Sequence, residues 1–392
     1  MPASPSLPIP AVAEHCGELA TPDPVQLAPS LRTVLAGVVD PRARRGVRHG
    51  LVTVLAAAVC AVQAGARSYV AIAEWVADLP AEVAAALGVV RAPCESTIRR
   101  VVQSVDADRF DRAIGTWIQN RCAGLTPGGR RRVIAVDGKA VRGARARGDG
   151  RARHLLGAVD HHARVVLGQV DVDGKTNEIT RFAPLLDTID IAGAVVTADA
   201  LHTQREHVDY LAARGAHWML TVKGNQPKLR QQLAALPWRV VEVGHRSTEN
   251  SPRRRAIRTL KVVSIAAGID FPHATQAIQI TRKTRPLRRR GRWHTETVYA
   301  ITDLPPQHVR PDELAAWLRG HWQIENALHW VRDVTYAEDH SQVRTGHGPQ
   351  VMASLRNLAI SVLHLGGATN IASGLRHHAR DVTRPLAVLG LT

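Results

Sequence analysis

Two short apolar segments, each followed directly by an aspartate, limit what this chain can fold into. The first is VIAVDGKAVRG, in which residues 133–136 are apolar and Asp137 follows. The second is GAVVTADA, in which Asp199 ends a similar run. Short apolar runs bounded by turn residues are typical of strands buried on both faces of an α/β sheet. We therefore expect two buried strands that each deliver a carboxylate to a strand end, with a turn at Gly138 after the first.

The segments around these strands predict a mixed sheet flanked by helices. HLLGAVD and VVLGQVDV are expected to form two antiparallel strands joined by a turn at residues 161–164. A helix ending at Gly215 and a strand, AHWMLTV, follow the second aspartate. This order of elements fits a mixed five-stranded α/β sheet with helices on its faces.

The N-terminal part has a different pattern. Residues 1–30 are rich in proline, lack a basic signal sequence and are expected to be a disordered tail. Residues 31–122 show helical periodicity and predict an all-α domain, followed by a linker at 123–130. A short helix carrying Arg99 and Arg100 is either the reading helix of a helix-turn-helix or a capped surface helix of a bundle.

Residues 238–305 predict a β-rich insertion. Four segments read as strands: WRVVEVGHR, AIRTLKVVSIA, TQAIQIT and WHTETVYAIT. The turns between them are basic, such as PRRR and RKTRPLRRRGR. These turns are either a solvated surface or contacts to a nucleic-acid backbone, and their density favours the second interpretation.

A long helix is predicted from about Pro311, with acidic residues in its first turn as helix N-termini prefer. Beside its apolar stripe lies a face that contains Glu325, His329 and Arg332. In an isolated helix, Glu325 would pair with one of these two residues, which follow it by about one and two turns.

The overall charge narrows the choice of partner. Lys and Arg outnumber Asp and Glu by 51 to 34, a formal net charge of +17, which favours a polyanion such as nucleic acid. GC-rich coding could also produce this excess of Arg. The longest apolar run, residues 51–64, is shorter than the roughly 20 residues that span a bilayer. We therefore expect no membrane contact and a cytoplasmic, nucleoid-associated location.

Asp137, Asp199 and Glu325 form the strongest candidate catalytic set. Two aspartates at the ends of adjacent strands, with a glutamate from a helix packed beside them, can converge. Such carboxylates would repel one another unless divalent cations neutralised them. Oxygen ligands without a Cys or His cluster indicate Mg²⁺ or Mn²⁺, and such sites perform phosphoryl transfer. Weaker candidates, on turns or beyond the helix, are Asp160, Asp171, Asp173, Glu338 and Asp339.

The motifs VDGKAVRG, VVTADALHTQ, LTVKGNQP, RGHWQIENALHWVRDVTYAED and LRNLAISVL resemble those of DDE-type insertion-sequence transposases, in the branch of the H-repeat-associated proteins. The resemblance implies a ribonuclease-H-like catalytic domain, divided into residues 131–237 and 306–370 by the insertion and followed by a C-terminal tail at 371–392. It also implies that Asp137, Asp199 and Glu325 are the catalytic triad and the ligands of Mg²⁺ (or Mn²⁺).

In the wider superfamily, the helix that carries the Glu also carries a Tyr, an Arg and a Lys at fixed spacing. Arg332 occupies the Lys position here, and His321 occupies the Arg position, with Arg319 nearby as a substitute. Trp322 and His329 could stack on a base, with ordinary packing as the alternative. The residues expected to contact DNA are Lys139, Arg142, Lys223, Asn225, Gln226, His321, Trp322, Asn326, His329, Arg332, Arg99 and Arg100.

The expected function is therefore binding of an element's terminal inverted repeats, followed by metal-dependent strand cleavage and strand transfer, by hydrolysis and transesterification. The expected partners are double-stranded DNA, both element ends and target, and a second copy of the chain. One alternative is a decayed transposase remnant that only binds DNA, but it would not need all three acids. Another is a stand-alone metal nuclease, but it would not need the helical domain or the β-rich insertion.

Overall fold

A computed structural model of the chain describes residues 30–126, 128–145, 152–172, 178–251, 254–286 and 292–391, without the side chains of Gln323 and Asn326. Almost all of the expected N-terminal tail lies outside the described residues, as do parts of the basic turns, at 252–253 and 287–291. Within the described part of the chain, no helix is long and apolar enough to cross a membrane.

Within the described residues, the strands form one mixed sheet of nine strands in the order β3-β2-β1-β4-β5-β9-β8-β7-β6. The strands are β1 Val133–Val141, β2 Arg153–Asp160, β3 Val166–Val172, β4 Val195–Ala198, β5 His217–Val222, β6 His245–Asn250, β7 Arg254–Ser264, β8 Gln276–Pro286 and β9 His294–Thr302. The expectation of a five-stranded sheet is wrong. The β-rich segment does not form a sheet of its own, because β9 pairs antiparallel with β5 and its remaining strands continue from that edge.

The first predicted strand of this segment is also misplaced. Residues 238–241 form a turn and a bend, residues 242–244 have no regular secondary structure, and β6 begins only at His245. Val240 and Val243 are 81% and 48% exposed, so these side chains have little apolar surface to pack against. The apolar residues of this segment therefore led to a wrong prediction of a strand.

The helices within residues 31–122 are α1 Leu31–Ala36, α2 Leu51–Gln63, α3 Tyr69–Ala77, α4 Ala81–Ala86, α5 Glu95–Ser104 and α6 Ala107–Cys122. Helix α6 packs closely on β3, since a Cβ on Gly115 would lie 2.7 Å from the carbonyl oxygen of Leu167. The buried residues of these helices belong to the same hydrophobic cluster as part of the buried residues of β1, β4 and β5, such as Ile134, Val196 and Trp218.

The remaining α-helices are α7 Phe182–Leu186, α8 Arg205–Ala213, α9 Pro227–Ala235, α10 Pro311–Ile324, α11 Gly348–Leu365, α12 Ile371–Ala379 and α13 Thr383–Leu389. Short 3₁₀ turns occur at Arg142–Ala144, Glu178–Arg181, Ala200–His202, Pro306–His308 and Glu338–His340. Residues 371–391, expected to be a tail, instead form α12 and α13. Leu375, Leu386 and Leu389 of these helices are buried in the main core, so this segment is part of the folded body.

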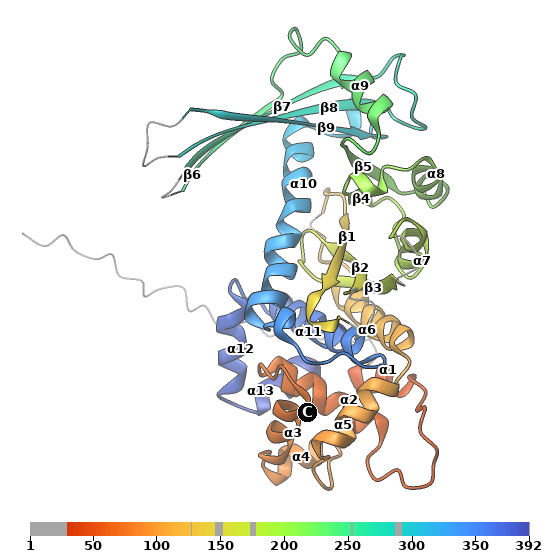
Figure 1. Cartoon of the computed structure of the whole chain (residues 1–392), viewed down its shortest axis with the longest axis vertical. Helices are drawn as coiled ribbons and strands as arrows, with labels where there is room; N and C mark the ends of the chain where they lie inside the picture. Colours follow the sequence, from red (N-terminus) through yellow and green to blue (C-terminus); the bar gives the residue numbers. More distant parts are fainter. Residues whose placement is uncertain are drawn as a thin grey trace, which may run out of the picture.

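Helix α10 runs along the long axis of the molecule, from the β6–β9 end towards the helical end (Figure 1). Leu314 and Leu318 of α10 pack with Val195 and Met219 of the sheet. At Glu325 the α-helix gives way to π turns over Glu325–His329 and Val331–Thr335, in which the N–H of Trp330 donates to the carbonyl of Glu325. Such π turns often mark functional sites.

Candidate active site

Asp137 and Asp199 lie side by side in the sheet. Strands β1 and β4 are parallel, and their register pairs Val136 with Ala198, so the two aspartates are the next residues along each chain. Asp137 Oδ1 accepts a hydrogen bond from the N–H of Gly138, and Asp199 Oδ1 accepts one from the N–H of Leu201, both at 2.9 Å. The predicted pairing of the two carboxylates in space therefore follows from strand register.

The predicted turn at Gly138 is absent. Strand β1 continues through Asp137 to Val141, because β2 pairs with it along this length and places Gly157 opposite Asp137. Only β4 ends at this level. Asp199 is therefore at a strand end, where it caps the turn Ala200–His202, whereas Asp137 is inside a strand.

Glu325 is exposed and begins the first π turn beyond α10. Its negative charge contributes to the raised pKa of Asp137. Burial is the main cause that raises the pKa of Asp137 to about 7, and the negative charges of Asp199 and Glu325 add to it. The negative charges of Asp199 and Glu325 thus both act on Asp137, while the convergence of all three carboxylates stays a prediction.

Three carboxylates provide the oxygen donors that Mg²⁺ and Mn²⁺ prefer. Burial is the largest cause of the raised pKa of Asp137, and the nearby negative charges of Asp199, Glu325 and Glu178 add to it. Among the described residues, however, no three His, Cys, Asp or Glu side chains are gathered closely enough to hold a metal ion. The donor chemistry thus fits a divalent cation, but these side chains do not form a closed ligand set.

The π turns redirect the side chains that follow Glu325. His329 Nδ1 lies 3.6 Å from Asp137 Oδ2, and burial lowers the pKa of His329 to about 3. Arg332 instead pairs with Glu338 at 2.8 Å. The pairing of Glu325 with His329 or Arg332 expected for an isolated helix is therefore replaced by contacts to other segments.

Three residues expected to contact DNA are buried, so this expectation is wrong for them. Arg332 is 2% exposed and ion-paired with the fully buried Glu338. Lys139 is 7% exposed, and its Nζ lies 2.6 Å from Asp333 Oδ1. Buried charges of this kind stay paired, because separation would leave an unpaired charge away from water.

His321 is the third. It is 8% exposed, and its Nδ1 lies 3.2 Å from Thr197 Oγ1, which also lies 3.1 Å from His161 Nε2. Burial is the main cause that lowers the pKa of His321 to about 4. A neutral, buried imidazole cannot take the role of the superfamily Arg whose position it occupies.

Other predicted DNA contacts are accessible. Arg142 and Lys223 are exposed, and the charge of Lys223 acts on His321 next to Asp199. The amides of Asn225 and Gln226 donate to the carbonyls of Ala200 and Thr203 at 2.6 and 2.8 Å, so they also brace the turn that follows Asp199. Arg99 and Arg100 are exposed on α5, where Arg99 pairs with Glu95 at 3.2 Å. The side chain of Asn326 lies outside the described residues.

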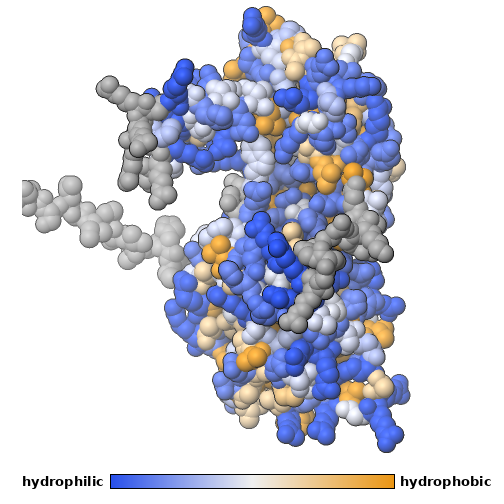
Figure 2. All heavy atoms as spheres, in the orientation of Figure 1, coloured by the Kyte–Doolittle hydropathy of each residue, from blue (hydrophilic) through white to orange (hydrophobic). Residues whose placement is uncertain are grey.

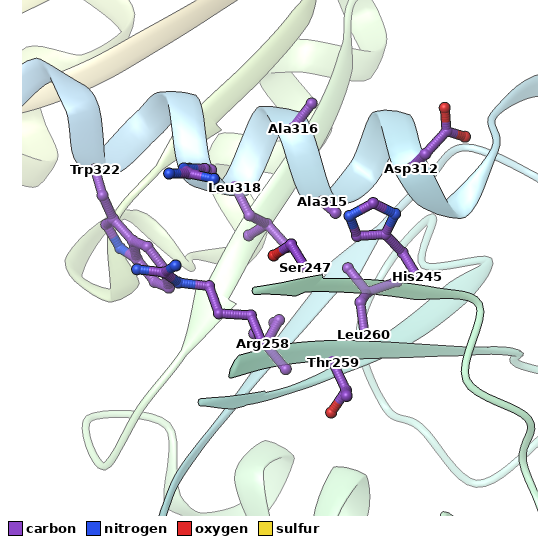
Figure 3. A pocket seen from close by; sticks show the side chains of 12 residues that line it. His245, Ser247, Arg258, Thr259, Leu260, Asp312, Ala315, Ala316, Leu318 and Trp322 are labelled. Atoms are coloured by element: carbon purple, nitrogen blue, oxygen red, sulfur yellow. The ribbon is translucent and has the colours of Figure 1, made fainter. Parts of the chain in front are cut away.

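Trp322 lines a cavity of about 230 Å³ between α10 and the strands β6 to β8. Figure 3 shows the side chain of Arg258 extending towards its indole ring. Arg258 and Arg319 both reach Glu249 Oε2, at 2.8 and 3.4 Å. The sequence indicated Trp322 and Arg319, but nothing in it linked them to Arg258.

Glu178 was also missed. Its Oε1 lies 2.7 Å from His154 Nε2, and its charge is among those that raise the pKa of Asp137. The signal was weak, because Glu178 belongs to neither of the apolar-run motifs and meets them only through the fold. Glu338, considered as a metal ligand, is instead enclosed by Arg332 and Arg356.

Comparison with known proteins identifies the family. The model of the transposase DDE domain matches residues 128–362, and that of the DDE_Tnp_1-associated domain matches residues 32–118. "Putative transposase YncI" of Escherichia coli O157:H7 is 29% identical over 371 residues, covering 90% of this chain and 91% of that protein. "H repeat-associated putative transposase YhhI" of Escherichia coli K12 is 27% identical, covering 83% and 88% of the two chains.

Among solved structures, a piggyBac transposase in a synaptic complex with hairpin DNA superposes with a TM-score of 0.41 at 10% identity, covering 92% of this chain and 77% of that one. These values are too low to indicate a shared fold. The match to the DDE-domain model, in contrast, extends over more than half of the chain. Transposases of this family cleave and transfer DNA and generally use divalent metal ions. This chain belongs to the DDE transposase family of insertion-sequence-type mobile elements.

Proposed function

We propose that this protein binds the terminal inverted repeats of its own insertion sequence and catalyses metal-dependent cleavage and transfer of the DNA strands at the nucleoid. Asp137, Asp199 and Glu325 are its catalytic residues. The observation that carries this proposal is the parallel register of β1 and β4, which puts the two aspartates next to each other while Glu325 acts on the same carboxylate.

The same three residues would hold Mg²⁺ or Mn²⁺. When bound, such ions activate the attacking water or 3′-hydroxyl and stabilise the leaving oxygen. The chain itself contributes position: Asp137 is fixed within a paired strand, and Asp199 by the turn that it caps. His329, neutral and beside Asp137, shields one side of this carboxylate without neutralising it.

The accessible cations are proposed to hold the DNA. Lys223 is exposed just after β5, which neighbours β4 and so lies beside Asp199. Arg142 is exposed just after β1, the strand that carries Asp137. Figure 2 shows a mostly hydrophilic face whose outline is hollowed between the β6–β9 end and the helical end. A hollow of this kind suits a polyanion, and the exposed part of the Trp322 indole supports the proposal that it stacks on a base.

We propose a matching division of labour along the chain. The helices of residues 31–122 bind DNA through α5, and residues 131–237 with 306–370 form a ribonuclease-H-like catalytic part. Residues 238–305 extend its sheet and add cationic surface. Because both ends of an element must be cut together, the active complex is a homodimer.

An excision assay tests this function. A donor plasmid carries the element's two ends, and excision is compared between wild type and Asp137→Asn, Asp199→Asn and Glu325→Gln. Each variant is expected to lose about a thousandfold or more in activity, because it loses a ligand of the cation that stabilises the transition state. Retention of DNA binding in a gel-shift assay shows that the variant is folded.

Two results would contradict the proposal. Equal excision by wild type and all three variants would remove the catalytic role of these acids. If all four proteins bind the ends but none excises, the chain is a decayed remnant that acts only as a DNA-binding protein.

A further inference from the structure

Glu178 lies against the backbone next to Asp137. A Cβ atom on Gly138 would collide with Glu178 Oε2 and would lie 2.5 Å from His154 Nε2 and 2.7 Å from Glu178 Cδ. With any larger residue after Asp137, the Glu178 carboxylate could not keep this position. The contact therefore joins the 3₁₀ turn Glu178–Arg181 to the strand that carries the first candidate catalytic residue.

Two histidines lie close to the Glu178 carboxylate. His154 Nε2 lies 2.7 Å from Oε1, and His202 Nε2 lies 3.6 Å from Oε2. His202 is 1% exposed, and neither of its ring nitrogens forms a hydrogen bond within the described part of the chain. This buried, polar ring is directed at Glu178 and lies only three residues after Asp199.

A third histidine fixes the turn that carries Glu178. The Nε2 atom of His207, in α8, lies 3.0 Å from the carbonyl oxygen of Ile179. The His207 ring stacks on the Phe182 ring, with 4.1 Å between the ring centroids. The His202 and His207 rings are 5.5 Å apart. The position of Glu178 is therefore set by β2, by the turn after β4 and by α8, all of which are elements of the folded core.

The charge of Glu178 acts at the same place as the triad. After burial, the carboxylates that raise the pKa of Asp137 are Asp199, Glu325 and Glu178. Two independent observations thus connect Glu178 with the candidate site: its electrostatic effect on Asp137, and its close approach to Gly138.

We propose that Glu178 is a positioning residue of the active site: held by His154 and His202 against the Gly138 backbone, it keeps Asp137 in place and adds a fourth negative charge that strengthens divalent-cation binding. The inference rests on the proposed function, because it takes Asp137 to be a metal ligand. It assigns no proton transfer to Glu178. Its effect is electrostatic and steric.

Mn²⁺ binding to the full-length protein, followed by electron paramagnetic resonance, tests the inference without requiring DNA. Glu178→Gln keeps the side-chain volume but removes the charge, and we expect it to bind Mn²⁺ about tenfold more weakly than wild type. Asp209→Asn is the matched control, because Asp209 also pairs with a histidine, His273, at 2.9 Å but lies on the exposed face of α8. This control should bind as wild type does, and Asp137→Asn should not bind.

Gly138→Ala provides a second, independent variant. It keeps the charge of Glu178 but displaces the carboxylate, so we expect weaker Mn²⁺ binding and a lower Tm. Combining it with Glu178→Ala removes the collision with the carboxylate but leaves the contact with His154 Nε2, so it should restore part of the Tm but not the Mn²⁺ affinity. A purely structural role for Glu178 would change the Tm without this separation of the two measurements.

The outcomes distinguish this inference from the proposed function. If Glu178→Gln binds Mn²⁺ within about twofold of wild type while Asp137→Asn does not bind, Glu178 has no role and the proposed function stands. If Asp137→Asn binds as wild type does, or wild type does not bind, both are overturned. If Gly138→Ala matches wild type in Tm and affinity, the contact itself is refuted.

Discussion

Asp137 and Glu338 are two carboxylates that side chains of the π turns approach, and their surroundings have opposite charge. Asp137 is 24% exposed and has other carboxylates around it, whereas Glu338 is fully buried between two guanidinium groups. Burial raises the pKa of Asp137 to about 7, with further increases from Asp199 and Glu325. Burial acts on Glu338 in the same direction, yet Arg332 and Arg356 lower its pKa to about 2.

Burial alone therefore does not decide the state of an acid in this protein. The neighbours decide it. Glu338 is neutralised by the chain itself, so it holds the segment after the π turns to α11. Among the described residues, no Lys or Arg side chain forms an ion pair with Asp137. A divalent cation is a chemical species that would balance its charge.

The largest expected effect concerns the neutralised acid. Arg332→Met should lower the free energy of unfolding by about 3–5 kcal/mol, because it leaves Glu338 buried with an incomplete set of cations. Chemical denaturation monitored by circular dichroism measures this change. Arg109→Met, which removes the partner of Asp106 in a pair that is 53% exposed at the arginine, should change it by less than about 1 kcal/mol. Similar losses in both variants would remove the contrast between buried and exposed pairs.

The next effect concerns the unbalanced acid and pH. The pKa of Asp137 is raised from 3.8 to about 7, so the native protein keeps a proton that the unfolded chain has released over this range. Stability contributed by this group is present at low pH and falls as pH rises from about 4 to 7. Asp137→Asn cannot ionise and should be more stable than wild type at pH 8, by on the order of 1–3 kcal/mol, with little difference at pH 4.

Thermal unfolding across this pH range, without divalent cations, checks the expectation. Addition of Mn²⁺ at pH 8 should raise the Tm of wild type and leave that of Asp137→Asn unchanged, since bound ligand stabilises only the folded state that holds it. Parallel pH profiles for the two proteins would mean that Asp137 has no raised pKa.

The smallest effect concerns the exposed cations. Lys223→Ala should weaken binding to the element's ends several-fold and reduce the slope of log affinity against log salt concentration by about 1, because one phosphate contact is lost. Fluorescence anisotropy at several salt concentrations measures both values. Lys228→Ala, which changes an exposed lysine of the neighbouring helix α9, is the control. An unchanged slope for Lys223→Ala would exclude Lys223 from the DNA contact.

Much of this fold was predictable because local patterns carry it. The apolar runs before Asp137 and Asp199 do form β1 and β4, and the long helix does begin at Pro311. The turn at residues 161–164 joins β2 and β3 as expected. Each of these features depends on residues that are close together in the sequence.

Other features were not predictable, because they depend on partners far away in the chain. The sheet continues because β5 pairs with β9, and no residue pattern in either segment specifies this pairing. A helical period of four places Glu325 over His329, but the π turns break this period and turn His329 to Asp137 and Arg332 to Glu338. Lys139 reads as a free cation after the aspartate, yet Asp333 neutralises it.

The amino-acid sequence by itself determined which carboxylates lie on buried strands, beside them or on the long helix, because apolar periodicity and turn residues act over short distances. The tertiary structure decided which charges stay free. A cation or an acid is available for DNA or metal only if no distant side chain has already neutralised it, and strand register and helix packing set those distant contacts.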